Sequence, residues 1–281
     1  MGMNSKINWC DHTWNPWQGC HKVSQGCKYC YMHRDLKRYG RNPNTVIRSA
    51  NQTFNMPFKI KEPATVFTCS WSDFFIEEAD QWRTEAWEII RKQKHLVFLI
   101  LTKRPERIMD CLPRGWNGGW PNVCLMVSTE NQESADERIP LLLSVPALYR
   151  GISAEPLLGL INFGDYISRN GKAFNKAGYT DSINWIIVGG ESGPSARPMH
   201  PDWARRIRND CRAAGTPFFF KQNGEFLTIP DAGNLGLKYS IADVLNANTV
   251  GGGFIRVGRN NSGRLLDGRE WNETPWNKEA R

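Results

Sequence analysis

Residues 65–101, TVFTCSWSDFFIEEADQWRTEAWEIIRKQKHLVFLIL, contain one full unit of the pattern that decides the fold. A short apolar strand over 65–69 comes first. A helical pattern over 80–93 follows, with its apolar residues on one face. The unit ends with residues 95–101, HLVFLIL, a predicted strand of the fully buried kind that is apolar after its first residue. Such strands are typical of parallel sheets that are covered on both faces. The stretch therefore predicts a strand–helix–strand unit of an α/β protein.

The same alternation continues on both sides of this unit. Further strands are predicted at 123–128, 147–152, 183–188 and 218–221, with a first strand before or around 14–18. Helices are predicted over 132–143 and 201–214, and a short one begins at Pro105. About seven strand–helix steps indicate a full or partial TIM-type (β/α) barrel with parallel strands. An open doubly wound sheet is the alternative.

The regular pattern fails after about residue 225. Residues 251–276, GGGFIRVGRNNSGRLLDGREWNETPW, are rich in glycine and asparagine, which indicates short hairpin-like pieces rather than a second core. We therefore expect a barrel over residues 1–224 and an irregular C-terminal extension over residues 225–281 that packs on the barrel.

Composition narrows the class of protein. The chain has 281 residues, 40% of them hydrophobic, and contains no apolar run long enough to span a membrane. Its first residues, MGMNSKINW, hold no hydrophobic signal region, so we expect a cytoplasmic protein without a membrane partner. Eight cysteines in such a chain favour metal binding or catalysis over disulfides. A net charge of +8 permits contact with nucleic acid.

Three of the cysteines stand together in residues 19–32, GCHKVSQGCKYCYM. Cys20, Cys27 and Cys30 are spaced C-x6-C-x2-C, and Tyr29 directly precedes the last of them. A [4Fe–4S] cluster normally takes four cysteines. A cluster that is held by three leaves one iron free to bind a small molecule. The motif therefore predicts reactive chemistry at a metal centre.

Polar residues follow nearly every predicted strand. In a parallel barrel the carboxyl ends of the strands meet at one mouth, where active sites lie. The cysteine run follows the first predicted strand, and the polar sets after the later strands lie at 70–73, 102–104, 128–131, 153 and 155, 189–193, and 221–222. We expect these residues to converge on a single site.

Together these segments resemble a known family. A cysteine triplet that ends in C-x-aromatic-C after the first strand of a barrel looks like the radical SAM superfamily. The segments WNPWQGCHKVSQGCKYCY, STENQESADERIPLLL and WIIVGGESGPSARPMHPDW are similar to its phage-associated three-cysteine-motif branch, which is encoded with a partner protein. The matches run from about residue 7 to residue 276.

The resemblance implies both cofactors and chemistry. Cys20, Cys27 and Cys30 would bind a [4Fe–4S] cluster, and the cluster would bind S-adenosyl-L-methionine (SAM). An electron from a flavodoxin- or ferredoxin-type reductant would cleave SAM to methionine and a 5′-deoxyadenosyl radical. That radical would remove a hydrogen atom from the substrate. Charge, aromatic content and phage association make a nucleic acid or nucleotide our first expectation for the substrate.

The resemblance also places the SAM-binding residues. The superfamily's usual Gly-Gly-Glu follows the second strand, where this chain has the SWSD turn, and its usual first cysteine gap is three residues rather than six. Ser128 stands where the fourth strand meets the ribose or the methionine part, Arg138 could pair with the carboxylate, and 189–191 could shape the adenine pocket. The full expected set is Tyr29, Ser70, Trp71, Ser72, Asp73, Ser128, Glu130, Asn131, Arg138, Gly189, Gly190 and Glu191.

Three other interpretations stay open at this point. A radical SAM enzyme could act on a peptide or a small metabolite. A zinc-binding nucleic-acid module without catalysis could use the three cysteines with His21 or His33. A catalytically inactive barrel could serve as a scaffold for its partner.

Overall fold

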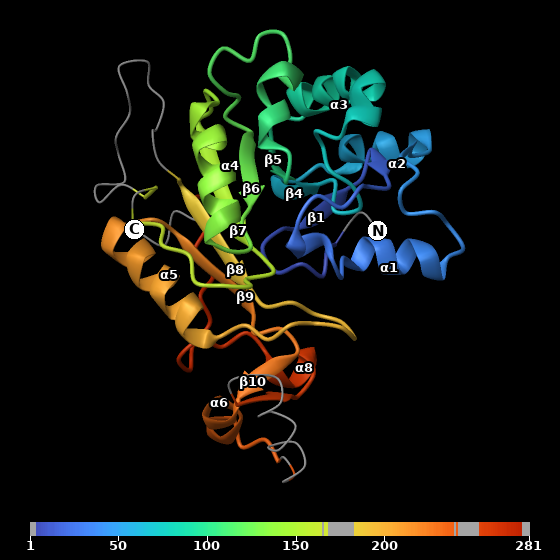
Figure 1. Ribbon diagram of the computed structural model, residues 1–281. Coiled ribbons are helices and arrows are strands. Elements are labelled where there is room, and N and C mark those ends of the chain that lie inside the picture. Colours follow the sequence, from blue (N-terminus) through green and yellow to red (C-terminus); the bar gives the residue numbers. More distant parts are fainter. Residues whose placement is uncertain (1–3, 165, 168–182, 239, 241–252, 277–281) are drawn as a thin grey trace.

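The computed structural model describes residues 4–164, 166, 167, 183–238, 240 and 253–276. Seven parallel strands form its central sheet, which curls into a half-barrel (Figure 1). The strands are β1 (His12–Trp14), β4 (Ala64–Thr68), β5 (Leu96–Thr102), β6 (Val123–Ser128), β7 (Tyr149–Ala154), β8 (Trp185–Gly189) and β9 (Phe218–Gln222).

The strands lie in the sheet in the order in which they occur in the chain, with β1 and β9 at the two edges. A doubly wound sheet would reverse direction at a switch point. The order therefore excludes that alternative and confirms a partial TIM-type barrel. Strand pairing is parallel at every step from β1 to β9.

The two faces of the sheet bury alternate residues. Phe98 and Ile100 of β5 point into the large core under the helices, and Leu99 between them joins a smaller cluster on the inner face. Trp9 and Trp185 belong to this inner cluster and contact each other edge to face. The inner face of the half-barrel therefore holds an apolar layer toward the amino ends of the strands, which we call its lower end. Polar residues stand at the carboxyl ends of the strands.

Three helices cover the outer face (Figure 1). They are α3 (Asp80–Lys92), α4 (Gln132–Ser144) and α5 (Pro201–Ala214), close to the predicted ranges. Pro201 occupies the first turn of α5, and Gly215 ends the helix in the left-handed conformation at φ 71°. The short helix predicted from Pro105 is a 3-10 turn, Pro105–Arg107, followed by a second such turn, Met109–Cys111.

A long insertion between β1 and β4 carries the cysteines. It contains a 3-10 turn, Gln25–Cys27, and the helices α1 (Tyr31–Arg38) and α2 (Asn51–Phe54). The first strand was predicted before or around residues 14–18. In the structure β1 lies at the start of that range, since it ends at Trp14. Residues Trp17–Gln18 form a separate antiparallel pair, β2 with β3 (Ile47–Arg48).

The C-terminal part contains β10 (Phe226–Thr228), α6 (Ile229–Asn234), β11 (Phe254–Arg256) and α8 (Arg259–Ser262). β10 and β11 pair antiparallel, in line with the predicted hairpin-like pieces. The chain then returns to β9, where Phe220 N donates to Trp271 O at 2.9 Å. Residues 239, 241–252 and 277–281 of the predicted extension lie outside the described residues, and its boundary at 225 stays a prediction. Within the described ranges, none of the helices has both the length and the apolar character to cross a membrane.

Candidate active site

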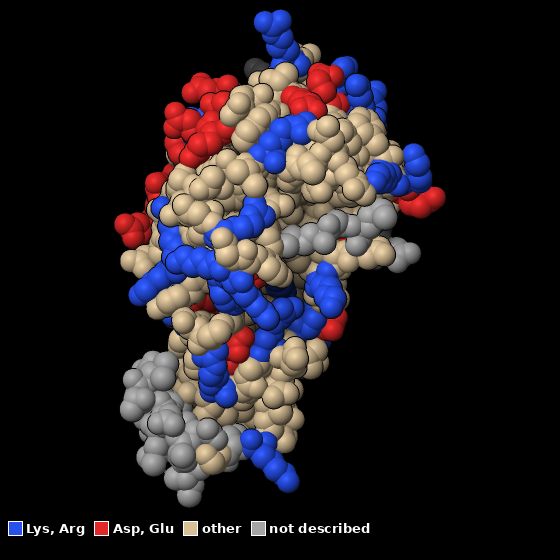
Figure 2. Space-filling model, turned by 90° about the vertical axis from the view of Figure 1, so that its right-hand side faces the viewer, with Lys and Arg blue, Asp and Glu red and all other residues tan. Residues whose placement is uncertain are grey.

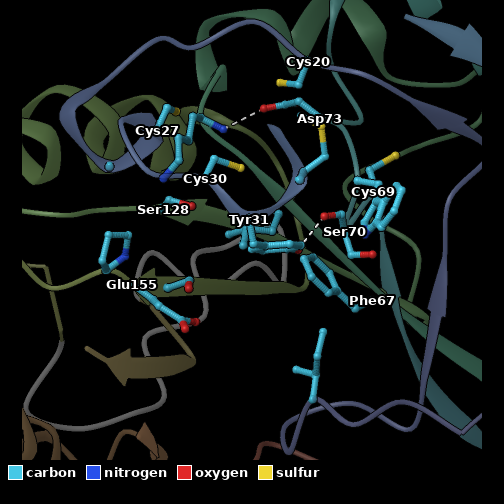
Figure 3. A pocket seen from close by; sticks show the side chains of 18 of the residues that line it. Cys20, Cys27, Cys30, Tyr31, Phe67, Cys69, Ser70, Asp73, Ser128 and Glu155 are labelled. Atoms are coloured by element: carbon cyan, nitrogen blue, oxygen red, sulfur yellow. Dashed lines mark hydrogen bonds between the residues drawn. The ribbon is translucent and has the colours of Figure 1, made fainter. Parts of the chain in front are cut away.

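A cavity of about 750 Å³ opens at the carboxyl ends of the strands. Its size is typical of small-molecule and cofactor sites. All three motif cysteines line it, and Figure 3 shows them around one end of the space, with Asp73 beside Cys20. The expected SAM-binding residues that also line it are Tyr29, Ser70, Trp71, Ser72, Asp73, Ser128, Gly190 and Glu191.

The thiols are partly buried and free of disulfides. Burial raises the pKa of Cys20 to about 12, an effect that the Asp73 carboxylate reinforces and the Arg104 guanidinium opposes. Burial also raises the pKa of Cys30. Such thiols lose their protons when a cationic metal centre binds, because the thiolate is the ligand. The donor set is therefore suited to a thiolate-ligated group rather than to a free nucleophile.

Asp73 holds Arg104 against the cysteine loop. Its carboxylate accepts hydrogen bonds from Thr102 Oγ1 at 2.7 Å, from the backbone N–H groups of Phe75 and Lys103 at 2.9 Å, and from Arg104 Nη1 at 3.1 Å. The same guanidinium donates to Cys20 Sγ at 3.7 Å and to His21 O at 3.1 Å. Asp73 thus acts on the cysteines through Arg104, and its own oxygens are fully engaged.

Glu130 forms a second anchor for the loop. It is 1% exposed, and it accepts hydrogen bonds from Ser24 Oγ at 2.8 Å, from Lys103 Nζ, and from Arg138 Nη1 at 3.1 Å. Burial alone would raise the pKa of this carboxyl, but the charges of Lys103 and Arg138 outweigh it and lower the pKa to about 2. A Cβ on Gly26 would lie 2.3 Å from Glu130 Oε1, so only glycine fits between the loop and this carboxylate.

The SWSD turn after β4 also binds the cysteine loop. Ser72 Oγ donates to Gly19 O at 2.5 Å, and Trp71 N donates to the side chain of Asn15 at 2.7 Å. The Trp71 ring packs in a small cluster with Met32 of α1, next to Cys30. Several polar groups of this turn that we expected to face SAM therefore bind the segment that carries the cysteines instead.

The turn after β8 contributes in a similar way. Glu191 forms a bidentate ion pair with Arg197, with contacts of 2.7 and 2.8 Å, and Arg197 Nη2 donates to Gln25 O at 3.0 Å. A Cβ on Gly190 would lie 2.1 Å from Asn223 O. The glycine is therefore required for the close approach of two backbone segments, whether or not a ligand binds there.

Four residues of the expected set do not line the cavity: Glu130, Asn131, Arg138 and Gly189. Asn131 is the N-cap of α4 and accepts from Ser134 N at 3.0 Å, completing a capping box. Arg138 is 3% exposed, and its guanidinium donates to Ser128 O as well as to Glu130. Asn131 and Arg138 therefore stabilise the elements that form the cavity wall and do not face the cavity themselves.

Other residues line the cavity that were not in the expected set. Tyr31 follows the last cysteine and donates through its hydroxyl to Ser70 O at 2.5 Å. Glu155 and Lys221, at the ends of β7 and β9, form an ion pair within the cavity wall (Figure 3 labels Glu155). In the sequence, Glu155 and Lys221 could have been found from their positions at the ends of predicted strands. Tyr31 could have been found from its position directly after Cys30.

The two histidines near the cysteines lie differently. Both line the cavity, but the side chain of His21 is exposed and pairs with Glu78, while His33 is buried. Among the residues that the structure describes, no three His, Cys, Asp or Glu side chains are grouped to hold one metal ion.

Two solved structures of spore photoproduct lyase are similar to this chain. A tyrosine-to-phenylalanine mutant has 15% identity and a TM-score of 0.45, and the match covers 75% of this chain and 63% of that one. A cysteine-to-alanine mutant with dinucleoside spore photoproduct has 15% identity and a TM-score of 0.46, with 82% and 60% covered. The chain thus spans about three fifths of the length of these structures.

A search of curated proteins gives no match. A family model does match, and it covers residues 4–275, nearly the whole chain. The chain therefore belongs to the family described as protein of unknown function, DUF5131.

Proposed function

We propose that this protein is a radical SAM enzyme. The observation that carries the proposal is the placement of Cys20, Cys27 and Cys30 around one cavity at the carboxyl ends of a parallel half-barrel. Thiolates are the ligands that [4Fe–4S] clusters take, and three of them leave one coordination position for a small molecule. A cavity of about 750 Å³ has room beside the thiols for such a molecule.

Each part of the site has a role in this proposal. The three cysteines would hold the cluster, and Ser70, Ser128, Glu155 and Lys221 offer polar groups on the cavity wall to SAM. When bound, the cluster and SAM together would supply one-electron cleavage of SAM and hydrogen abstraction from the substrate. Glu130 and Asp73 keep the cysteine loop in place, and the apolar inner layer around Trp9 closes the lower end of the half-barrel against water.

The substrate that we propose is a nucleic acid or a nucleotide. Lys and Arg side chains gather in a band across the middle of the face in Figure 2, which supports an anionic substrate. A peptide or a small metabolite is the alternative. A one-electron donor protein, a co-encoded partner and a cytoplasmic location belong to the same proposal.

The test is anaerobic reconstitution with iron and sulfide, followed by dithionite and SAM. We expect a brown protein with about four irons per chain and formation of 5′-deoxyadenosine, measured by chromatography. A colourless protein that holds one zinc and leaves SAM intact would instead establish the zinc-binding module.

Arg104 is expected to raise the reduction potential of the bound cluster. Its positive charge and its N–H group at Cys20 Sγ stabilise the more negative, reduced form. In Arg104→Gln the reduction potential should fall by about 60 mV, which corresponds to a roughly tenfold change in the equilibrium constant for transfer of one electron. Potentiometric titration with EPR detection measures this shift.

Arg107→Gln is the control for this prediction, since Arg107 lies three residues away but pairs with Asp80 outside the cavity. An unchanged potential in Arg104→Gln at full iron content would show that the contact with Cys20 does not tune the cluster.

A further inference from the structure

Three of the cations that line the cavity already have acidic partners. The pairs are Lys103 with Glu130, Arg104 with Asp73 at 3.1 Å, and Lys221 with Glu155. A three-thiolate cluster in its oxidised state and SAM carry opposite net charges that cancel, so neither calls for further cations. We therefore looked for substrate-binding charge among cavity-lining arginines that are exposed to solvent, at the mouth of the cavity.

Three arginines meet at that mouth. Arg34 comes from α1, Arg256 ends β11 and Arg259 begins α8, so the first belongs to the barrel and the others to the C-terminal part. Arg34 and Arg259 line the cavity directly. In Figure 1, α1 lies on the right-hand side, and α8 lies below it, nearer the middle.

Gly193 brings two of these arginines together. Arg256 Nη2 donates to Gly193 O at 2.6 Å. A Cβ on Gly193 would lie 2.7 Å from Arg34 Nη1, and the residue adopts φ 111°, a conformation that side-chain-bearing residues rarely reach. The missing side chain therefore lets the Arg34 guanidinium lie against the backbone beside Arg256. Two like charges are held close to each other at an open surface.

Acids offset this cluster only in part. Asp35 accepts from Arg34 Nε at 3.0 Å, and Glu225 lies 3.3 Å from Arg256 Nη2. Arg259 is exposed and forms no ion pair with any residue of the described ranges. The side chains of Arg34 and Arg256 are 48% and 40% exposed, so solvent reaches them. Guanidinium N–H groups at this mouth remain available to an anion.

We propose that Arg34, Arg256 and Arg259 bind phosphate groups of the substrate while its reacting part enters the cavity. The planar guanidinium fork matches two phosphate oxygens at once, which is why arginine is favoured for phosphate recognition. The inference rests on the proposed function for what happens inside the cavity. The phosphates could belong to a free nucleotide or to a strand, and phosphate binding itself requires no SAM cleavage.

The test measures binding by the reconstituted full chain without reductant. A fluorescein-labelled single-stranded DNA 12-mer and a labelled mononucleotide are titrated in separate anisotropy experiments at several salt concentrations. In the variant Arg34→Ala/Arg256→Ala/Arg259→Ala, we expect affinity to fall at least about tenfold, and the slope of log K against log salt to lose about 2 for the strand.

A control variant, Lys61→Ala/Lys92→Ala/Lys94→Ala, removes the same charge from exposed positions that do not line the cavity. Retained binding in this control and weak binding in the arginine variant support the site. If only the strand binds, the phosphates come from a polymer; if both ligands bind equally, a nucleotide suffices.

Equal loss in both variants, or no loss in the arginine variant, overturns the inference. The outcome is separable from that of the proposed function. A protein that cleaves SAM but binds neither phosphate ligand refutes the anion site alone. A protein that binds the strand through these arginines but leaves SAM intact refutes the radical mechanism alone.

Discussion

Cys27→Ala is expected to abolish the bound cluster and with it the cleavage of SAM. Cys27 lines the cavity between the other two motif cysteines in sequence, and a cluster with two thiolates has lost one of its three protein ligands. Iron content should fall well below about four per chain, and 5′-deoxyadenosine should decrease by more than about 100-fold, since even residues that only support a ligand cost 10–100-fold. Iron analysis, visible absorbance and chromatography give three separate measurements.

Cys111→Ala is the matched control for that result. Cys111 is also a partly exposed free thiol, but it lies outside the cavity, with Arg107 as its neighbour. It should keep both iron and activity. Circular dichroism distinguishes loss of the cluster from loss of the fold. A folded Cys27→Ala protein that still holds about four irons would show that Cys27 is not a ligand of the cluster.

Glu130→Gln is expected to have the largest effect on stability. The change removes the buried counter-charge of Arg138, whose other acidic neighbour is exposed, and weakens the hydrogen bond to Ser24 of the cysteine loop. Removal of one partner from a buried pair costs about 3–5 kcal/mol. For a chain of this size that corresponds to a fall in Tm on the order of 10 °C, measured by differential scanning calorimetry.

From the lowered pKa of Glu130 we also predict that the stability of the folded protein depends on pH. The pKa of Glu130 is lowered to about 2 in the folded protein, against about 4.3 for an unfolded glutamate. Its contribution is therefore complete above about pH 4.5 and is lost as the pH falls toward 2. The wild-type protein should lose stability over this range faster than Glu130→Gln.

Glu137→Gln serves as the control for both Glu130 predictions. Glu137 lies on the same helix, but its side chain is 69% exposed and 4.0 Å from Arg138. Its removal should change Tm by little, as for most exposed ion pairs. Similar losses in the two variants would mean that burial of Glu130 does not determine the effect.

The strands could be predicted from the sequence because their signal is local. Residues 123–127 are apolar along their whole length, and the strand runs from Val123 to Ser128 in the structure, as predicted. The partial barrel followed from the number of strands, although only the spatial order excluded the doubly wound alternative. Convergence of the polar strand ends followed from parallel topology and holds for most of the residues that were named.

The supporting contacts could not be predicted in this way. Arg104 reaches Cys20 across 84 residues of sequence, and Ser24 reaches Glu130 across 106. No periodic pattern carries such pairs, because each depends on how two loops meet at the mouth. For the same reason Arg138 was expected to face a ligand, whereas the structure places it behind the cavity wall.

The inner layer of the half-barrel has a consequence for how the chain folds on the ribosome. Each strand can pair with the one made just before it, so the sheet can grow in the order of synthesis. Its inner face, however, is completed by Trp9 and Trp276, which are far apart in the sequence and both pack around Trp185. This closure has a very long sequence separation, and such contacts form late. We expect the nascent protein to expose apolar inner surface until Trp276 has left the ribosome, a stage at which chaperones would act.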